Sequence, residues 1–371
     1  MESSEGRLDA VVRAPELATL FDGSGPVASV YVTTLPDVEN AAPRSLQHWK
    51  ALRGELERAG APADLLDAVE QQVPDAHQHG AALGVVAAPG VLHVEHHPVP
   101  PPSDLGRYGP LPAVLPLLRW RQTTPPVVVV LADRKGADLR ALRRDRPNVA
   151  REAGGQDFPL TKVHAGGWSS RRYDERVERT WEDNAQDVAA EVARLTEQVD
   201  ARLVVAAGDE RALALLTREL DAPLADRFRI LDGGRAAGAG GVDDEELAEA
   251  VAEAVDADTD HVLAVFEEER GQDDRAVEGA AATTEALARA AVDVLLVADD
   301  LDEGRTAWFG PAPTSLSTTP EELRAMGVDT PVEAPLVDVL VRAALGTSAG
   351  IRIVPADRAP KEGVGAVLRW R

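Results

Sequence analysis

The chain has 371 residues, a net charge of −24, and 44% hydrophobic, 27% charged and 4% aromatic residues. This composition excludes wholesale disorder, and the length predicts two or three domains. There is no cysteine, which excludes disulfides and thiol catalysis, and no apolar run reaches the roughly 18 residues of a membrane helix. The start, MESSEGRLDA, lacks the features of a secretory signal. We expect a cytoplasmic protein without a membrane partner.

The first segment, residues 1–125, is predicted to be an α/β domain. Apolar spacing favours both strands and helices in this segment. The strands are expected at 26–34, 84–88 and 91–96, and the helices at 44–59 and 62–73. The proline pair Pro125-Pro126 marks the end of this domain.

The second segment, residues 126–257, shows strands alternating with helices, which predicts an α/β layer fold. Strands are expected at 127–131, 137–143, 157–163, 202–207 and 227–231, and helices at 169–199 and 211–220. The buried face of the long helix is predicted to include Trp181 and Ala185. After the glycine-rich residues 236–241, Asp243 and Glu246 form a capping-box pattern that opens an acidic helix to about Arg270.

The third segment, residues 258–371, is predicted to be a small α/β sandwich. Its helices are expected at 276–291, 320–326 and 335–345, and its strands at 292–298, 306–309, 351–354 and 364–370. The fold class is therefore α/β with three domains.

The charge changes sign in one window of the second segment. Residues 134–179 hold twelve Arg or Lys and seven Asp or Glu, a net charge of +5 in a strongly acidic protein. Such a window predicts an anion-binding surface that contacts a phosphate backbone. The alternative is that its charges pair along the helix, as Glu175 and Arg179 are spaced to do.

Within this window lies the sequence GGWSSRRY, residues 166–173. The glycines permit a tight turn, Ser169 is suited to cap the following helix, and Arg171 and Arg172 bring positive charge to the helix start. Trp168 is suited to stack on a base. The alternative interpretation is a plain strand-to-helix turn with a buried tryptophan.

The loop and its helix resemble the Gly-Gly-Gln loop and helix of the eukaryotic and archaeal class-one peptide chain release factors. GGWSSRRYDERVERTWEDNAQDVAAEV looks more like the bacterial relatives of that family, the group that includes the ribosome hibernation factor Balon. Residues 276–298 and 362–370 are similar to the release factors' C-terminal domain. The resemblance covers residues 126–371 and extends to the first segment only by domain order.

The resemblance implies a release-factor-like fold whose middle domain contacts 23S rRNA near the peptidyl-transferase centre. The N-terminal domain would then face the decoding centre. The residues we expect to contact RNA are Gly166, Gly167, Trp168, Ser169, Arg171, Arg172, Arg176, Lys162, His164, Arg143, Arg144 and Arg146.

Two departures from the family pattern bear on catalysis and decoding. Trp168 stands where release factors carry the loop glutamine, and Ser170 corresponds to a nearby glutamine of some relatives. A literal Gly154-Gly155-Gln156 lies upstream and is interpreted as a hairpin turn, with Gln156 as an alternative functional tip. The Asn-Ile-Lys-Ser decoding motif is absent.

We therefore expect a hibernation factor that occupies the A site of idle or stalled ribosomes without hydrolysing peptidyl-tRNA, with elongation factor Tu as a possible companion. One alternative is a ribosome-rescue peptidyl-tRNA hydrolase that uses Gln156 or Ser170. Another is a stress-related protein-binding adaptor. No cofactor is expected.

A metal site is a weaker hypothesis. His93 and Glu95 alternate along a predicted strand and, with His77 or His79, have the residue types of a metal site. Surface histidines beside a hairpin are the favoured interpretation, and Asp299-Asp300 is likewise interpreted as a solvated loop. We therefore expect no metal.

Overall fold

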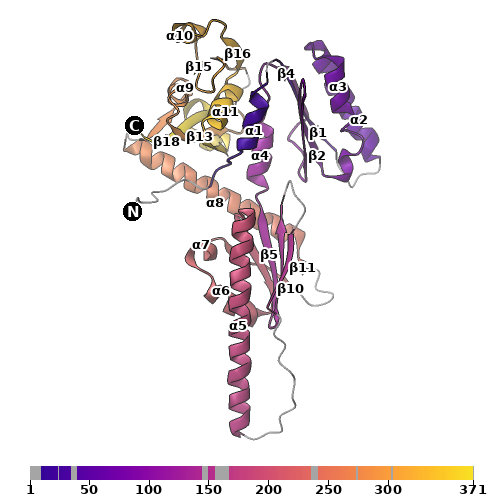
Figure 1. The fold of residues 1–371 in the computed structure, drawn as a ribbon, viewed down its shortest axis with the longest axis vertical. Coiled ribbons are helices and arrows are strands. Elements are labelled where there is room, and N and C mark those ends of the chain that lie inside the picture. Colours follow the sequence, from indigo (N-terminus) through magenta and orange to yellow (C-terminus); the bar gives the residue numbers. More distant parts are fainter. Residues whose placement is uncertain are drawn as a thin grey trace. The chain divides into compact units, whose positions relative to one another are not determined.

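A computed structural model shows the fold (Figure 1). It describes residues 10–23, 25–34, 40–143, 149–154, 167–234, 241–272, 275–301 and 304–370, and for residues 167–178 only the helical backbone. The chain forms two compact units. The first unit combines Met1–Gln122 with Ala257–Arg371, and the second unit is Thr123–Asp256. No helix of the described residues is long and apolar enough to cross a membrane.

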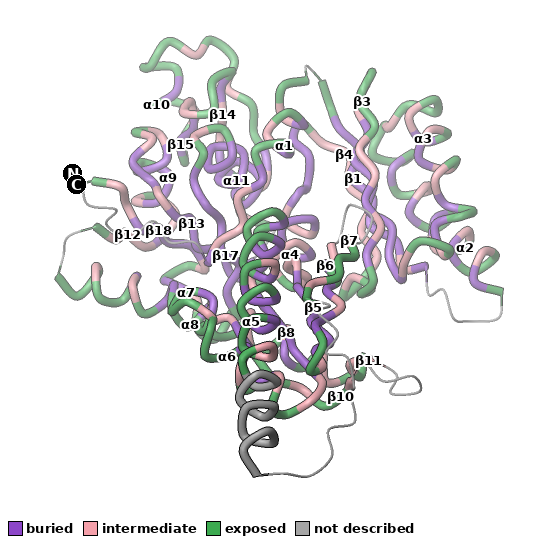
Figure 2. The backbone as a smooth tube through the Cα atoms, turned by 60° about the horizontal axis from the view of Figure 1, so that its bottom comes forward, coloured by how far each residue is buried: buried purple, intermediate pink, exposed green. Residues whose placement is uncertain are grey.

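The N-terminal half of the first unit is built on an antiparallel sheet with strand order β3-β2-β1-β4. Its strands are β1 (Val27–Thr33), β2 (Ala82–Ala88), β3 (Val91–His97) and β4 (Leu105–Gly109). The side chains of β1 alternate between the two faces of the sheet, and both sets are buried (Figure 2). Val30 and Val32 pack in the core beneath α2 (Ala41–Arg58) and α3 (Ala63–Glu70). Tyr31 packs on the opposite side with α4 (Leu115–Thr123).

The C-terminal half of the first unit has a second sheet, with strand order β12-β18-β13-β17. Its strands are β12 (Ala276–Glu278), β13 (Val292–Ala298), β17 (Gly350–Val354) and β18 (Val364–Leu368). Strands β13 and β17 are parallel, and the apolar helix α11 (Leu336–Gly346) lies between them in the chain. A small sheet and a short helix complete this half: β14 (Thr306–Phe309), β15 (Leu316–Ser317), β16 (Val332–Pro335) and α10 (Pro320–Ala325).

The helix predicted over residues 276–291 is wrong in its first part. Residues 276–278 form β12, and α9 (Ala280–Ala288) begins only after Gly279, whose φ of +87° suits glycine. The carboxylate of Glu362 accepts a hydrogen bond of 2.9 Å from the Ala280 N–H at the helix start. This partner is distant in sequence, so local spacing could not reveal the break.

The two halves of the first unit share one hydrophobic core, which includes both Tyr31 and Leu295. The short helix α1 (Pro15–Ala18) also contributes to this core through Leu17. Sequence analysis predicted separate domains for residues 1–125 and 258–371. The structure groups both segments in one compact unit. A division of the chain into three domains stays a prediction.

The second unit is built on a mixed sheet with strand order β7-β6-β5-β8-β9. Its strands are β5 (Val127–Asp133), β6 (Gly136–Leu142), β7 (Val149–Gly154), β8 (Leu203–Gly208) and β9 (Phe228–Ile230). The continuous valine run of β5 places side chains in both of the unit's cores. One face is covered by α5 (Gly167–Val199) and α6 (Glu210–Glu219) (Figure 1). The other face packs against Leu247 and Ala250 of α8 (Asp244–Gly271).

Smaller elements complete the second unit: α7 (Ala222–Ala225), β10 (Gly233–Gly234) and β11 (Gly241–Val242). The predicted cap of α8 is confirmed, because the Asp243 carboxylate accepts hydrogen bonds from the backbone N–H groups of Glu245 and Glu246. Strand β7 was not predicted, and the strand predicted at 157–163 lies outside the described residues. The fold class is thus mixed α/β with several sheets.

Candidate nucleic-acid interface

The GGWSSRRY sequence lies at the start of the longest helix. Helix α5 begins at Gly167 and runs for 33 residues, about 50 Å at the usual rise. Ser169 therefore lies inside the first turn and does not precede the helix, as a capping residue would. Five more candidates lie on the backbone of this helix: Trp168, Ser170, Arg171, Arg172 and Arg176.

The remaining candidate residues fall mostly outside the described residues. This applies to Arg144, Arg146, Gln156, Lys162, His164 and Gly166. Gly154 is the last residue of β7, so the proposed hairpin turn at residues 154–156 begins at a strand end. Arg143 directly follows β6 and is half-buried. That the candidate side chains lie close together and form one RNA-binding surface therefore stays a prediction.

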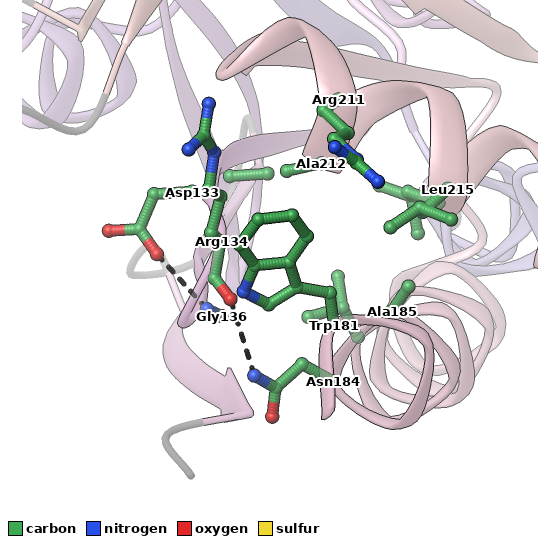
Figure 3. Close-up of a pocket in the computed structure, with 12 residues that line it drawn as sticks. Asp133, Arg134, Gly136, Trp181, Asn184, Ala185, Arg211, Ala212 and Leu215 are labelled. Carbon is green, nitrogen blue, oxygen red and sulfur yellow. Dashed lines mark hydrogen bonds between the residues drawn. The ribbon is translucent and has the colours of Figure 1, made fainter. Parts of the chain in front are cut away.

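Further along α5, the indole of Trp181 lies between two arginines (Figure 3). The guanidinium carbon of Arg134 is 5.2 Å from the ring centroid, and that of Arg211 is 4.8 Å away. Arg134 lies in the turn between β5 and β6, and Arg211 in the first turn of α6. Cation–π contacts of this kind attract each arginine to the ring face. The cluster therefore joins α5 to the end of β5 and the start of α6.

Asp209 holds the side chain of Arg134 and the backbone at the start of α6. Its carboxylate accepts a bond of 3.1 Å from Nε of Arg134 and also caps α6 by accepting from the N–H groups of Arg211 and Ala212. Burial alone would raise the pKa of Asp209, but the Arg134 hydrogen bond and these backbone N–H groups lower it. Asp209 thus remains ionised at neutral pH and holds the β5–β6 turn to the start of α6.

The basic window is partly neutralised by acids outside it. Arg134 pairs with Asp209, and Arg151 lies 3.9 Å from a carboxylate oxygen of Glu191. Arg140 and Arg179 are exposed and form no ion pair with the residues that the structure describes. The excess positive charge of residues 134–179 is therefore smaller at the surface than the sequence count suggests, but it is not cancelled.

The shape of this site suits a surface contact more than a buried small substrate. The cavity beside Trp181 has a volume of about 20 Å³, roughly enough for one water molecule. Its wall includes Asn184, whose amide nitrogen donates to the Arg134 carbonyl over 3.3 Å. Sequence analysis identified Trp181 only as a core residue and missed its two arginine partners. Arg134 and Arg211 are 77 residues apart, so no local signal connects them.

The histidine-rich hairpin has a different arrangement from a metal site. Nε2 of His93 lies 2.8 Å from the Glu95 carboxylate, which also forms an ion pair with Arg121. Burial alone would raise the pKa of Glu95, but His93 and Arg121 lower it to about 2. Among the described residues, no three His, Cys, Asp or Glu side chains are grouped so that they could hold a metal ion.

Comparison with known proteins shows which protein family the second unit resembles. Residues 126–272 match bacterial archaeo-eukaryotic release factor family 2. The predicted resemblance to bacterial relatives of the release factors is thereby confirmed. The family segment contains β5 to β9, α5 and α6, the Trp181 cluster and α8.

Nearly the whole chain is also similar to individual proteins. The protein Rv2629 of Mycobacterium tuberculosis, described as uncharacterized, is 29% identical over 369 residues, 97% of each chain. Among solved structures, archaeal translation termination factor aRF1 is 16% identical over 96% of each chain, with a TM-score of 0.24. Archaeoglobus fulgidus Pelota is 14% identical over 97% of this chain and 94% of its own, with a TM-score of 0.35.

Proposed function

We propose that this protein binds the ribosome and occupies the A site of idle or stalled ribosomes as a hibernation factor, without hydrolysing peptidyl-tRNA. The observation that carries the proposal is the long helix α5 beginning inside the Gly-Gly sequence, within the segment that matches the release-factor family. A release-factor-like fold with three functional regions would place this loop at the peptidyl-transferase centre, and residues 1–125 at the decoding centre.

The charge pattern supports contact with 23S rRNA. Residues 134–179 carry a net charge of +5, while the whole chain carries −24. Arginine supplies ten of the twelve positive charges in this window, and its forked guanidinium is suited to phosphate. Exposed Arg140 and Arg179 extend the basic character beyond the loop into the described part of the unit. The acidic remainder of the chain would face solvent or basic proteins, with elongation factor Tu as a possible companion.

The loop composition argues against hydrolysis. Trp168 stands where release factors carry the catalytic glutamine, and an indole cannot position water as an amide does. A factor that enters the A site without this amide would block the site instead of releasing the peptide. We infer from this role a cytoplasmic location and a connection to stress, when idle ribosomes accumulate.

The test mixes the full-length protein with vacant 70S ribosomes and with ribosomes carrying peptidyl-tRNA. Pelleting measures binding, and a release assay measures hydrolysis. We expect binding without release, with affinity falling steeply as salt rises, because phosphate contacts release counterions. Arg171→Glu with Arg172→Glu should weaken binding at least about tenfold and reduce the salt slope by about 1 to 2.

The matched control is Arg194→Glu with Arg218→Glu, which makes the same charge change at exposed positions of α5 and α6. It should leave binding within about twofold. Equal losses in both double variants, or a salt-independent affinity, would contradict a specific ribosomal contact and favour the protein-binding adaptor. Binding with peptide release would favour the rescue hydrolase, and Gln156→Ala and Ser170→Ala would then locate the functional tip.

A further inference from the structure

The first unit contains a second basic stretch, which the proposed function does not use. From Asn40 to Gly54 the chain has three basic residues and no Asp or Glu. Arg53 is held by the carboxylates of Glu57, Asp67 and Glu70. Arg44 and Lys50 are exposed and form no ion pair with the residues that the structure describes, which leave out Asp37 and Glu39 just before the stretch.

A cavity of about 480 Å³ lies beside this stretch. Three polar residues of α2 line it, namely Arg44, Gln47 and His48. Their spacing places them on one side of the helix, which begins at Ala41 and whose exposed residues can be followed in Figure 2. The other lining residues are Thr33, Thr34, Ala51, Leu52 and Asp104.

Asp104 orients the histidine of this cavity. Its Oδ2 lies 2.5 Å from Nδ1 of His48, and its Oδ1 accepts a hydrogen bond of 2.8 Å from the Thr33 N–H. Both carboxylate oxygens are therefore engaged. Because Nδ1 of His48 is held by Asp104, Nε2 is the nitrogen that remains for a ligand, and the side chain is 41% exposed.

We propose that this cavity binds a phosphate group, either of an RNA backbone or of a free phosphate compound. Arg44 offers a forked guanidinium, His48 an Nε2–H when protonated, and Gln47 and Thr33 neutral donors. Among the residues that the structure describes, the only acid that lines the cavity is Asp104, whose oxygens already accept from His48 and Thr33. A tetrahedral anion with several acceptor oxygens matches this set of donors. The proposal does not depend on the ribosomal function proposed above.

The proposal has a definite pH dependence. Histidine changes charge between pH 5 and 8, whereas arginine stays charged throughout. In the described part of the chain, the charged or titratable groups that line the cavity are Arg44, His48 and Asp104. Only protonated His48 can donate to Asp104 and to a phosphate oxygen at once. A phosphodiester, whose own charge is constant in this range, therefore binds more tightly to the form of the protein in which His48 is protonated.

The experiment follows the histidine side-chain NMR signals of the full-length protein, with the His48 signal assigned by its loss in His48→Gln. The probes are the dinucleotide ApA, which presents a phosphodiester, and inorganic phosphate, with acetate at equal ionic strength as the control. A saturable shift of the His48 signal with either phosphate probe supports the site. A response to ApA alone identifies an RNA backbone as the source, and a response to phosphate alone identifies a free phosphate compound. No response, or an equal one with acetate, overturns the proposal.

A matched pair of variants separates a site from general charge. Arg44→Gln and Lys50→Gln each remove one positive charge from an exposed position of α2, but only Arg44 lines the cavity. Arg44→Gln should weaken binding of the responding probe about tenfold, as expected for a charge-assisted hydrogen bond, and Lys50→Gln less than about twofold. Equal losses overturn the proposal. So does a pH dependence of ApA affinity, measured by calorimetry, that persists in His48→Gln.

Discussion

The side-chain amide of Gln122 bonds to both backbone groups of Ile353, as a neighbouring strand would. Its nitrogen donates to the Ile353 carbonyl over 2.7 Å, and its oxygen accepts from the Ile353 N–H over 2.9 Å. Two residues away, Val12 forms an antiparallel bridge with Ile351. Strand β17 is the last strand of its sheet, so these contacts satisfy backbone groups that an edge strand would leave unpaired.

Gln122→Ala should destabilise the first unit by about 1 to 3 kcal/mol, because two partly buried backbone groups lose their partners. Urea unfolding followed by circular dichroism measures the change. Gln198→Ala, at an exposed position of α5, is the control and should change stability by less than about 0.5 kcal/mol. Equal effects of the two variants would show that the Gln122 bonds add nothing.

Trp181→Ala should destabilise the second unit by about 2 kcal/mol, because it removes a half-buried ring and two cation–π contacts. Trp181→Phe keeps an aromatic face and should lose less than half as much. Thermal unfolding gives both values. If the two variants are equally destabilised, an aromatic face at position 181 adds no stability. The cation–π contacts with Arg134 and Arg211 would then not stabilise the unit.

Asp209→Asn should separate the two tasks of this side chain. Asparagine retains the helix cap of α6 but loses the charge opposite Arg134, so we expect a loss of at most about 1 kcal/mol. Asp209→Ala removes both and should cost about 1 to 2 kcal/mol. The lowered pKa of Asp209 adds a pH dependence: the wild-type advantage over Asp209→Asn should shrink as the carboxyl is protonated in acid.

Glu95→Gln should make stability less dependent on pH in acid. The pKa of Glu95 is about 2 in the folded chain and 4.5 ordinarily. Its carboxylate therefore stabilises the fold fully above pH 4.5, and this contribution is lost as the pH falls toward 2. We expect Glu95→Gln to be about 2 kcal/mol less stable at pH 7, with the difference vanishing near pH 2. Exposed Glu182→Gln is the control, and a constant difference across this range would contradict the assignment.

Much of the fold follows from local patterns. The runs that form β1, β5 and β13 are apolar and rich in valine, and the Asp243 cap was readable from its spacing with Glu246. Strand β12 was missed because its three residues border an alanine-rich helix, and only pairing with β18 makes them a strand. Local propensity cannot anticipate a partner that lies some ninety residues away.

The candidate site, like the fold, was predictable from the sequence only in part. A Gly-Gly sequence followed by an amphipathic pattern was enough to predict the long helix, although α5 starts two residues before the predicted Ser169. The contacts of Trp181 were not predictable, because they depend on how α5, α6 and the β5–β6 turn pack together. His48 and Asp104 were overlooked for the same reason, since 56 residues separate them.

The shared core of the first unit has a consequence for synthesis. Residues 123–256 are contiguous, so this unit can fold as soon as it has left the exit tunnel. Tyr31 and Trp120, by contrast, belong to a core completed by Leu295 and Ile351. The N-terminal sheet with its helix α4 therefore keeps part of this apolar surface incomplete until nearly the whole chain has been translated. Chaperone contact during translation is expected to concentrate on that surface.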